Sequence, residues 1–443
     1  MTARWRSLDS GPLAVRSFRL LAGGQFASTI GDFCYAVALP WLVLANHGSV
    51  VLLGVVLACY GVPRTVLIPV GGLLTDKVGA RRLMLAADLT RGVLLVALAV
   101  LAARQVASLA ALAPTAALIG AGEGLFIPAS YAILPSLLAG DKLAAGNAVS
   151  SAAIQAGSFV GPALGGILVA ATHGSAAAFA VDAGSFGVSA LTLALIPRYP
   201  PDAGPAGPAD TVPADAVPAD TVPTDTVPAD HGGPAEPWPA EPSPASPPRA
   251  LTLLRRSRAL QVNLVVVIAA NLAIGGMSEV ALPALAHATY GAAGYGALRA
   301  CLAAGAVAGT LAAALTGRLR RPVVFAACTF LVEAAAICLV PYLGGEAGAA
   351  AALLLLGAGN GLGNTIMVTV LQRRIPRDVL GRVMGVIMLC VFGSFPLSVA
   401  ITGLLVHRIG PAPFFPIAGG LVAAAVLYGL TQPEFRRFEV VKP

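Results

Sequence analysis

Charged side chains are scarce in this chain: Asp, Glu, Lys and Arg make up 11% of its 443 residues. A soluble globular protein carries about a quarter of its residues as charged side chains, so the composition excludes a soluble fold. The ten-residue segments of alternating polarity that mark an outer-membrane barrel are also missing. Because 57% of the residues are hydrophobic, and a backbone in lipid must form its own hydrogen bonds, the chain is expected to be an all-α integral membrane protein.

The chain also lacks the clustered reactive side chains that an enzyme or a metal site requires. Its six cysteines are scattered through apolar segments without paired spacing, which argues against a disulfide framework and against a metal site. Its five histidines are isolated in loops or at the ends of apolar segments, and no G-x-x-x-x-G-K-[ST] phosphate-binding loop occurs. We therefore expect no catalytic residue, no metal and no cofactor.

Long apolar stretches are what the sequence does contain. A membrane helix needs about 20 apolar residues, and twelve stretches meet this requirement in two sets of six. The predicted helices are 17–45, 50–74, 82–103, 109–137, 143–171 and 175–197, followed by 259–287, 293–317, 321–342, 347–373, 378–407 and 412–431.

Basic residues fall mainly on one side of these predicted helices. Most of the 28 Lys and Arg lie before the first span, in the loops after even-numbered spans, and at the end of the chain. Basic loops stay in the cytoplasm, so both termini are predicted to be cytoplasmic. The positive net charge is thereby explained by topology, and we expect no nucleic-acid partner. Few lysines and abundant alanine point to a GC-rich bacterium, and hence to its inner membrane.

A segment of different composition separates the two sets. Four consecutive pentads, from Thr211–Asp215 to Thr226–Asp230, repeat proline every five residues and are flanked by further Pro, Ala and acidic residues. Such a sequence favours extended polyproline II and cannot form a core. We predict a six-helix bundle at 1–198, a cytoplasmic disordered linker at 199–257 and a second bundle at 258–443. The linker is interpreted as a spacer; a partner-binding or regulatory tail is the alternative.

Two motifs resemble those of a known transporter family. The turn after the second span reads G-x-L-x-D-K-x-G-x-R-R and is similar to motif A of the major facilitator superfamily, with residues Gly72, Asp76, Lys77, Gly79, Arg81 and Arg82. The fifth span is similar to motif C, which marks the proton-driven antiporter branch, with residues Gly157, Gly161, Pro162, Gly165 and Gly166. The resemblance implies two pseudo-symmetric six-helix bundles that open alternately to each side. It also implies that Asp76 latches against the start of the eleventh helix, near residues 378–381, in the outward-open state.

Shorter matches resemble the bacterial subfamily of enterobactin exporters and macrolide-efflux-like proteins. They are Gly31-Asp32, Pro63-Arg64, 87–91, 126–129, 146–148, 181–186, Leu371-Gln372 and 381–383. This resemblance implies export of a small amphipathic compound such as a drug, antibiotic or siderophore, driven by proton antiport, by a protein expected to be a monomer. The alternatives are a proton-coupled importer of the same fold and a membrane sensor or scaffold that uses the 199–249 tail.

Ionisable side chains inside the spans are the candidates for the transport machinery, because a charge at mid-bilayer needs a partner or a watery cavity. Asp32 and Arg64 lie about midway through the first two spans. We expect them to pair in a cavity. Either Asp32 exchanges protons while Arg64 tunes its pKa or holds an anionic group of the substrate, or the two form a permanent structural pair. Glu123, flanked by glycines, is the alternative proton carrier or else a structural partner for a neighbouring helix. Asp88 and Arg91 are one helical turn apart and are expected to form a structural pair near the cytoplasmic end.

The second half offers fewer candidates. Glu279 and Arg299 are expected to pair, with Glu279 as a further candidate for proton coupling and Arg299 for substrate binding. Asp182 in the sixth span is interpreted as a packing or gating contact, and Glu333 as peripheral. Side chains that could donate hydrogen bonds to a substrate, or instead join neighbouring helices, are Gln155, Asn360 and Asn364.

Overall fold

The structure is a computed structural model, which describes residues 11–46, 49–138, 140–197, 256–316, 319–375 and 377–438. The described residues contain helices and no strand. Most of the predicted linker, residues 198–255, lies outside the described residues, and the interpretation of it as a spacer stays a prediction.

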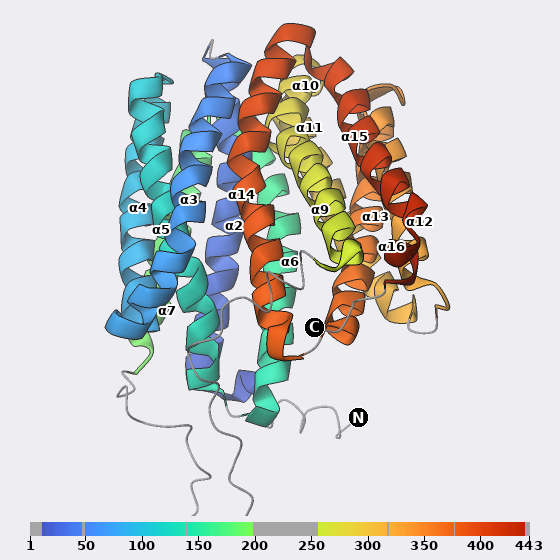
Figure 1. The fold of residues 1–443 in the computed structure, drawn as a ribbon. Helices are drawn as coiled ribbons and strands as arrows, with labels where there is room; N and C mark the ends of the chain where they lie inside the picture. Colours follow the sequence, from blue (N-terminus) through green and yellow to red (C-terminus); the bar gives the residue numbers. More distant parts are fainter. Residues whose placement is uncertain are drawn as a thin grey trace, which may run out of the picture.

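In the described part of the chain, twelve helices are long and apolar enough to cross a membrane, which agrees with the predicted number of spans (Figure 1). In the N-terminal half they are α2 (Arg16–Ala45), α3 (Val50–Val78), α4 (Ala80–Ala103), α5 (Leu109–Leu137), α6 (Gly140–Thr172) and α7 (Ala176–Leu195). In the C-terminal half they are α9 (Arg258–Gly276) with α10 (Leu282–Thr289), α11 (Gly291–Ala313), α12 (Pro322–Leu339), α13 (Gly345–Arg374), α14 (Arg377–Ile409) and α15 (Pro411–Thr431).

Three short elements complete the described chain. They are the 3₁₀ turns η1 (Pro12–Ala14) and η3 (Ala314–Thr316), and the helix α16 (Pro433–Arg437), which the sequence analysis did not predict. The seventh span, predicted as the helix 259–287, is one helical run over Arg258–Thr289. A π-helical segment, η2 (Met277–Ala281), lies within it and contains Glu279. Single π turns inside helices are frequent at functional sites.

The turn between α3 and α4 shows how the local sequence sets helix ends. Gly79 is the single residue between the two helices and has φ +89°, a left-handed conformation that side chains with a Cβ disfavour. Its N–H donates to the carbonyl of Thr75. The tight turn predicted between these two spans is therefore confirmed, but it is confined to Gly79, because α3 continues past the predicted end at 74 and α4 begins before the predicted start at 82.

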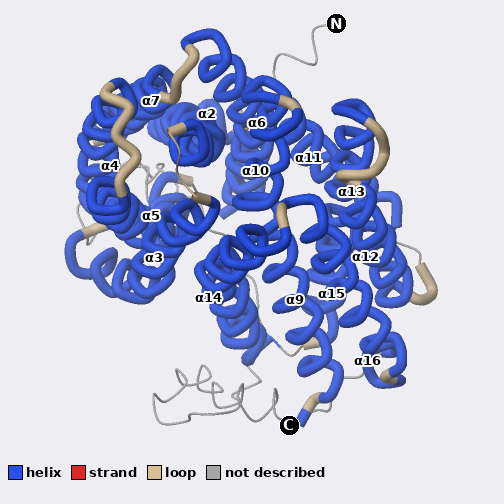
Figure 2. The backbone as a smooth tube through the Cα atoms, turned by 90° about the horizontal axis from the view of Figure 1, so that it is seen from above, coloured by secondary structure: helices blue, strands red, loops and turns tan. Residues whose placement is uncertain are grey.

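The helices form two bundles that lie side by side (Figure 2). In the N-terminal half α2 packs against α6 and α7, and α3 packs against α5; in the C-terminal half α11 packs against α13, and α14 against α9. The most extensive contacts between the halves are those of α3 with α14 and of α6 with α11. We call the end of the molecule where α2 begins and α13 ends the basic end, and the opposite end the far end.

Close approaches between the halves lie toward the far end. A Cβ on Gly54 would lie 3.2 Å from the Cα of Gly403, and one on Gly166 would lie 2.8 Å from the Cα of Gly296. The rings of Trp41 and His287, near the far ends of α2 and α10, are 4.9 Å apart. Glycines thus let backbone meet backbone at two crossings, as is common between membrane helices.

Candidate functional site

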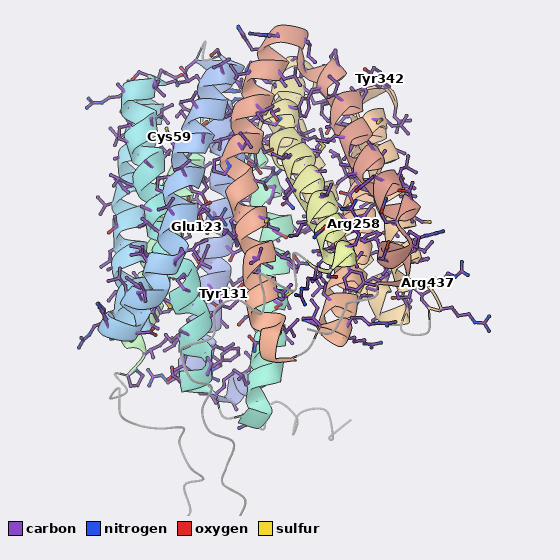
Figure 3. The ribbon with its side chains drawn as sticks, in the orientation of Figure 1. Cys59, Glu123, Tyr131, Arg258, Tyr342 and Arg437 are labelled. Carbon is purple, nitrogen blue, oxygen red and sulfur yellow. The ribbon has the colours of Figure 1, made fainter. Side chains whose placement is uncertain are left out.

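A central cavity lies between the two halves. Its volume is about 470 Å³, and side chains from α2, α3, α4, α5, α6 and α7 line it together with side chains from η2, α11 and α14. Figure 3 labels two of its residues on α5, with Glu123 at about mid-height and Tyr131 nearer the basic end. The charged side chains in its wall are Asp32, Arg64, Arg91, Glu123, Asp182, Glu279 and Arg299.

Glycines on α5 bring α3 close enough for the first ion pair of the cavity. A Cβ on Gly120 would overlap the carbonyl of Tyr60, and one on Gly124 would overlap the carbonyl of Arg64. Gly120 and Gly124 are four residues apart, and so are Tyr60 and Arg64, so the two contacts repeat along one face of each helix. The flanking glycines, which the sequence analysis noted around Glu123, therefore set the distance between α3 and α5.

Glu123 accepts from two donors on α3. The Arg64 guanidinium lies 3.1 Å from one carboxylate oxygen, and the Tyr60 hydroxyl donates to the other. The Arg64 guanidinium also lies over the Phe392 ring, 5.0 Å from its centroid, and so touches the C-terminal half. About a fifth of each charged side chain is exposed, 20% for Arg64 and 18% for Glu123.

A second ion pair joins α4 to α2. A terminal nitrogen of Arg91 donates to Asp32 over 2.5 Å, and its guanidinium lies 4.2 Å from the centroid of the Phe186 ring. The side chain of Arg91 is 4% exposed, whereas that of Asp32 is 42% exposed. Buried Arg91 thus holds the Asp32 carboxylate in an ion pair, and this carboxylate faces the cavity.

The structure corrects two predicted pairings. The Asp32–Arg64 pair is wrong, because Arg64 binds Glu123 and Arg91 binds Asp32. The Asp88–Arg91 pair is also wrong, since Asp88 accepts from the Ser189 hydroxyl, at 2.6 Å, and is buried outside the cavity. One helical turn is enough to point the two side chains of α4 at different neighbours.

Arg91 and Tyr60 line the cavity but were not among the predicted site residues. Arg91 lies near the middle of α4, so counting its distance from both ends of the span would have placed it at cavity depth. A Cβ on Gly122 would lie 2.9 Å from the Arg91 side chain, and this glycine leaves the space that Arg91 occupies. Tyr60 stands one turn before Arg64, which is the only signal for it in the sequence.

Asp182 is a third carboxylate of the N-terminal half in the cavity wall. It is 1% exposed and lies nearer the far end of α7. A Cβ on Gly31 would overlap the Asp182 carboxylate, so the glycine before Asp32 allows α2 and α7 to pack closely. Ser185 donates to its backbone carbonyl over 2.7 Å. Its interpretation as a packing or gating contact stays a prediction.

In the C-terminal half, the predicted pairing of Glu279 with Arg299 is confirmed. The two side chains lie 2.8 Å apart, and the same nitrogen of Arg299 donates to the carbonyl of Ser278 over 2.9 Å. Both charged residues line the central cavity and also a neighbouring cavity of about 240 Å³. Their roles in proton coupling and substrate binding stay predictions.

The three predicted hydrogen-bonding side chains do not gather in the central cavity. Asn360 donates to buried Glu333 over 3.2 Å and lines the smaller cavity. Asn364 is exposed on α13, and Gln155 is half-buried beside the cavity-lining Ile154. Among the residues described in the central cavity wall, neither Asn364 nor Gln155 occurs.

The motif-like turn at 72–82 fixes α7 through one of its arginines. The Arg81 side chain donates over 2.8 Å to each of the Leu193 and Ala194 carbonyls, at the end of α7. Asp76, Lys77 and Arg82 are exposed, and nothing lies within 4 Å of a Cβ built on Gly72. The side chains at 376–379, where α14 begins, lie outside the described residues, so the Asp76 latch stays a prediction.

The glycines of the fifth span face two different helices. A Cβ on Gly157 would meet Thr29, one on Gly161 would meet Phe33, and one on Gly165 would meet Cys34, all of which lie on α2. Gly166 instead faces α11 of the other half. The Pro162 carbonyl would lie 2.6 Å from a Cβ on Gly296 of that helix. The pattern thus produces close packing on both sides of α6, and its role in antiport stays a prediction.

The site suits the binding of an organic molecule. Aromatic side chains on both sides, including Tyr60, Phe126 and Phe395, alternate with the ion pairs in the cavity wall. Aromatic faces and carboxylates together attract organic cations. Within the described part of the chain, no group of three or more His, Cys, Asp or Glu side chains could hold a metal ion.

Comparison with known proteins supports this picture of the fold. A family model described as "Major Facilitator Superfamily" matches residues 21–398. Among solved structures, a peptide transporter POT in complex with sulfate has a TM-score of 0.69 at 16% identity and covers 96% of both chains. A bacterial homologue of the iron transporter ferroportin has a TM-score of 0.65 at 15% identity, over 94% of this chain and 98% of that one.

Similar curated proteins include transporters and exporters of bacteria. The chain is 31% identical over 192 residues to the multidrug efflux pump Tap of Mycolicibacterium fortuitum. This match covers 42% of this chain and 45% of Tap. It is 27% identical over 437 residues, 95% of each chain, to the uncharacterized MFS-type transporter YfiS of Bacillus subtilis. It is 28% identical over 193 residues to the enterobactin exporter EntS of Shigella boydii, covering 43% of this chain and 45% of EntS. The matches to both named exporters thus span less than half of those proteins.

Proposed function

Since the chain belongs to the major facilitator superfamily and is a multi-pass transporter of a bacterial plasma membrane, we propose that it exports a small amphipathic organic compound in exchange for protons. The observation that carries this proposal is Asp32, a carboxylate that faces a cavity between the two halves while a buried arginine holds it from behind. A proton antiporter needs a group of this kind, which either a proton or a substrate can reach.

Asp32 is the proposed proton carrier. It is 42% exposed and has one ion-pair partner, whereas Glu123 is 18% exposed and is held by both Arg64 and Tyr60. A proton on Asp32 removes its attraction for Arg91, and an organic cation near the same carboxylate competes with that proton. Glu123 is the proposed positioning group, which holds Arg64 against the aromatic wall. Each proton that enters across 100 mV supplies about 2.3 kcal/mol for this exchange.

Substrate is proposed to enter from the cytoplasm in the conformation described. Basic residues stay on the cytoplasmic side of a membrane, which makes the basic end the cytoplasmic one. The halves approach each other closely toward the far end, at Gly54 with Gly403 and at Gly166 with Gly296. Cavity residues such as Tyr131, which is 75% exposed, lie toward the basic end. An exporter loads its substrate in this state.

The nature of the cargo is proposed from the cavity wall and from the relatives. Tyr60, Phe126, Phe392 and Phe395 offer aromatic surface beside the carboxylates, which fits an amphipathic molecule with a cationic group better than a sugar. Two of the similar proteins are named as a multidrug efflux pump and an enterobactin exporter. Their names support export as the direction of transport.

The test is efflux of a fluorescent amphipathic cation from energised cells that produce the full chain. We expect efflux that an uncoupler stops, and we expect Asp32→Asn to reduce it to the rate of cells without the protein. The matched control is Asp88→Asn, which makes the same change at a buried aspartate outside the cavity and should keep most of the activity. Membrane levels of all three chains are compared by immunoblot.

Two outcomes would contradict the proposal. Uncoupler-sensitive efflux that survives Asp32→Asn would move the proton site away from Asp32. Proton-driven accumulation of the dye in the cells, in place of efflux, would show that the same fold works as an importer.

A further inference from the structure

A large cavity lies outside the transport site, at the basic end of the C-terminal half. Its volume is about 900 Å³, and it lies where α11 and α13 end and where α12 and α16 meet them. Figure 3 labels Arg437 on this flank of the molecule. Six arginines line the cavity: Arg320, Arg321, Arg373, Arg374, Arg436 and Arg437.

The charge in this cavity has one sign. No carboxylate occurs among its described lining residues. Within the described part of the chain, Arg320, Arg321, Arg373 and Arg374 form no ion pair or hydrogen bond through their side chains. Like charges that converge without a counter-charge repel one another. This arrangement is stable when an anion lies between them.

The sorting of loops during membrane insertion does not explain this convergence. That process requires basic residues in the cytoplasmic loops, but it does not require residues from three separate segments to surround one space. Here a loop before α12, the last turn of α13 and the helix α16 each contribute a pair of adjacent arginines. We propose that this cavity binds the phosphate groups of an anionic phospholipid.

The depth and the polarity of the cavity favour a lipid over a soluble phosphate. Its wall runs along α13 from Arg373 back to Thr365, which is about 12 Å along a helix. Its wall also contains Ala313, Leu319 and Val324, which are partly exposed and whose apolar surfaces a free phosphate would leave uncovered. The glycerol and the first acyl carbons of a lipid cover such surfaces, and the arginines at the rim then meet the headgroup.

The number of arginines favours a lipid with two phosphate groups. A guanidinium binds phosphate oxygens through two parallel hydrogen bonds, so the four arginines without a described partner (Arg320, Arg321, Arg373 and Arg374) exceed what one phosphodiester group can accept. Basic pockets between membrane helices on the cytoplasmic side bind such headgroups. Cardiolipin is the probe that matches this chemistry.

The test measures lipid bound to the purified full-length chain by native mass spectrometry in detergent. Tetraoleoyl cardiolipin, dioleoyl phosphatidylcholine and inorganic pyrophosphate are titrated in separate experiments. We expect cardiolipin to bind, and phosphatidylcholine and pyrophosphate to bind much more weakly. The double variant Arg373→Gln/Arg374→Gln should weaken cardiolipin binding roughly thirtyfold, which is about fivefold for each arginine.

The matched control is Arg16→Gln/Arg19→Gln, which removes two exposed arginines at the same end of the molecule but outside the cavity. It should leave cardiolipin binding unchanged. Equal weakening by both double variants would overturn the proposal in favour of general attraction to basic surface. Pyrophosphate that binds as tightly as cardiolipin would overturn the assignment to a lipid. Arg320 and Arg321 lie in a loop, so the double variant Arg320→Gln/Arg321→Gln repeats the test if the α13 variant is unstable.

Discussion

The two halves of the molecule use ionisable side chains in different ways. In the N-terminal half, Arg91 interacts electrostatically with Asp32, Glu123 and Asp182, so one guanidinium on α4 serves carboxylates on α2, α5 and α7. In the C-terminal half, Arg299 forms one ion pair, with Glu279. A shared cation can redistribute its interactions when one carboxylate gains a proton, whereas an isolated pair can only form or break. The proposed proton carrier, Asp32, lies in the half where the cation is shared.

The basic end shows a second difference between the halves. In the N-terminal half Arg81 donates to two carbonyls at the end of α7 and so joins helices. In the C-terminal half Arg373 and Arg374 end α13 beside a large cavity without forming a described hydrogen bond. Arginine thus joins two helices in the N-terminal half, whereas in the C-terminal half Arg373 and Arg374 line the cavity proposed to bind a lipid.

The largest effect is expected from reversing an ion pair in each half. Asp32→Arg/Arg91→Asp places a new carboxylate beside Glu123 and Asp182, which Arg91 serves in the native chain. The reversal also removes the carboxylate of the proposed proton carrier, so efflux should fall to the rate of cells without the protein. Glu279→Arg/Arg299→Glu keeps its isolated pair and should retain most of the activity. Dye efflux per amount of inserted protein measures both.

Equal losses from the two reversals would remove the distinction between the halves. Each single substitution serves as the control that shows whether its pair matters at all. Arg91→Asp alone should be as inactive as the double variant, because the cluster of carboxylates is already created. Glu279→Arg alone should be worse than its double variant, since the second change restores the pair.

The sequence predicts the spans well and the pairs of charges poorly, for a physical reason. The length of an apolar stretch is set by the thickness of the bilayer, so the predicted ends of α2 and α5 agree with the structure to within one residue. A pairing depends instead on how each helix is rotated and on which neighbour it meets. Asp32 and Arg64 lie at similar depth, but the glycines of α5 direct Arg64 to Glu123.

The pair in the C-terminal half could be predicted because few alternatives exist there. Glu279 and Arg299 lie on consecutive spans, and each is the ionisable residue that faces the cavity from its span. The π-helical segment that contains Glu279 has no comparable signal, since it depends on the packing of η2 against α9, α14 and α15. The arginine cavity could not be predicted either, because α16 returns to α12 only in the folded chain.

An intermediate effect is expected from filling the space between α3 and α5. Gly124→Ala places a methyl group against the Arg64 carbonyl and should destabilise the fold by about 1–3 kcal/mol through overpacking. Since the same contact holds Arg64 beside Glu123, efflux should fall as well. The control is Gly72→Ala, on the same pair of helices, where nothing lies within 4 Å of the new methyl group. Thermal unfolding of the purified proteins in detergent measures the difference, and an equal melting temperature for the two variants would contradict the contact.

The smallest effect is expected at the basic end and compares its two uses of arginine. Arg81→Gln loses two hydrogen bonds to the Leu193 and Ala194 carbonyls, partly exposed to solvent, and should cost about 1 kcal/mol of stability. Arg373→Gln removes the same charge from a residue without a described partner, so its stability in lipid-free detergent should be unchanged. Adding cardiolipin should raise the melting temperature of Arg81→Gln as much as that of the native chain. It should raise the melting temperature of Arg373→Gln less, because a ligand that binds the folded state stabilises it more as its affinity rises. If Arg373→Gln were the less stable variant without lipid, its side chain would join helices as Arg81 does, and the two halves would use their arginines alike.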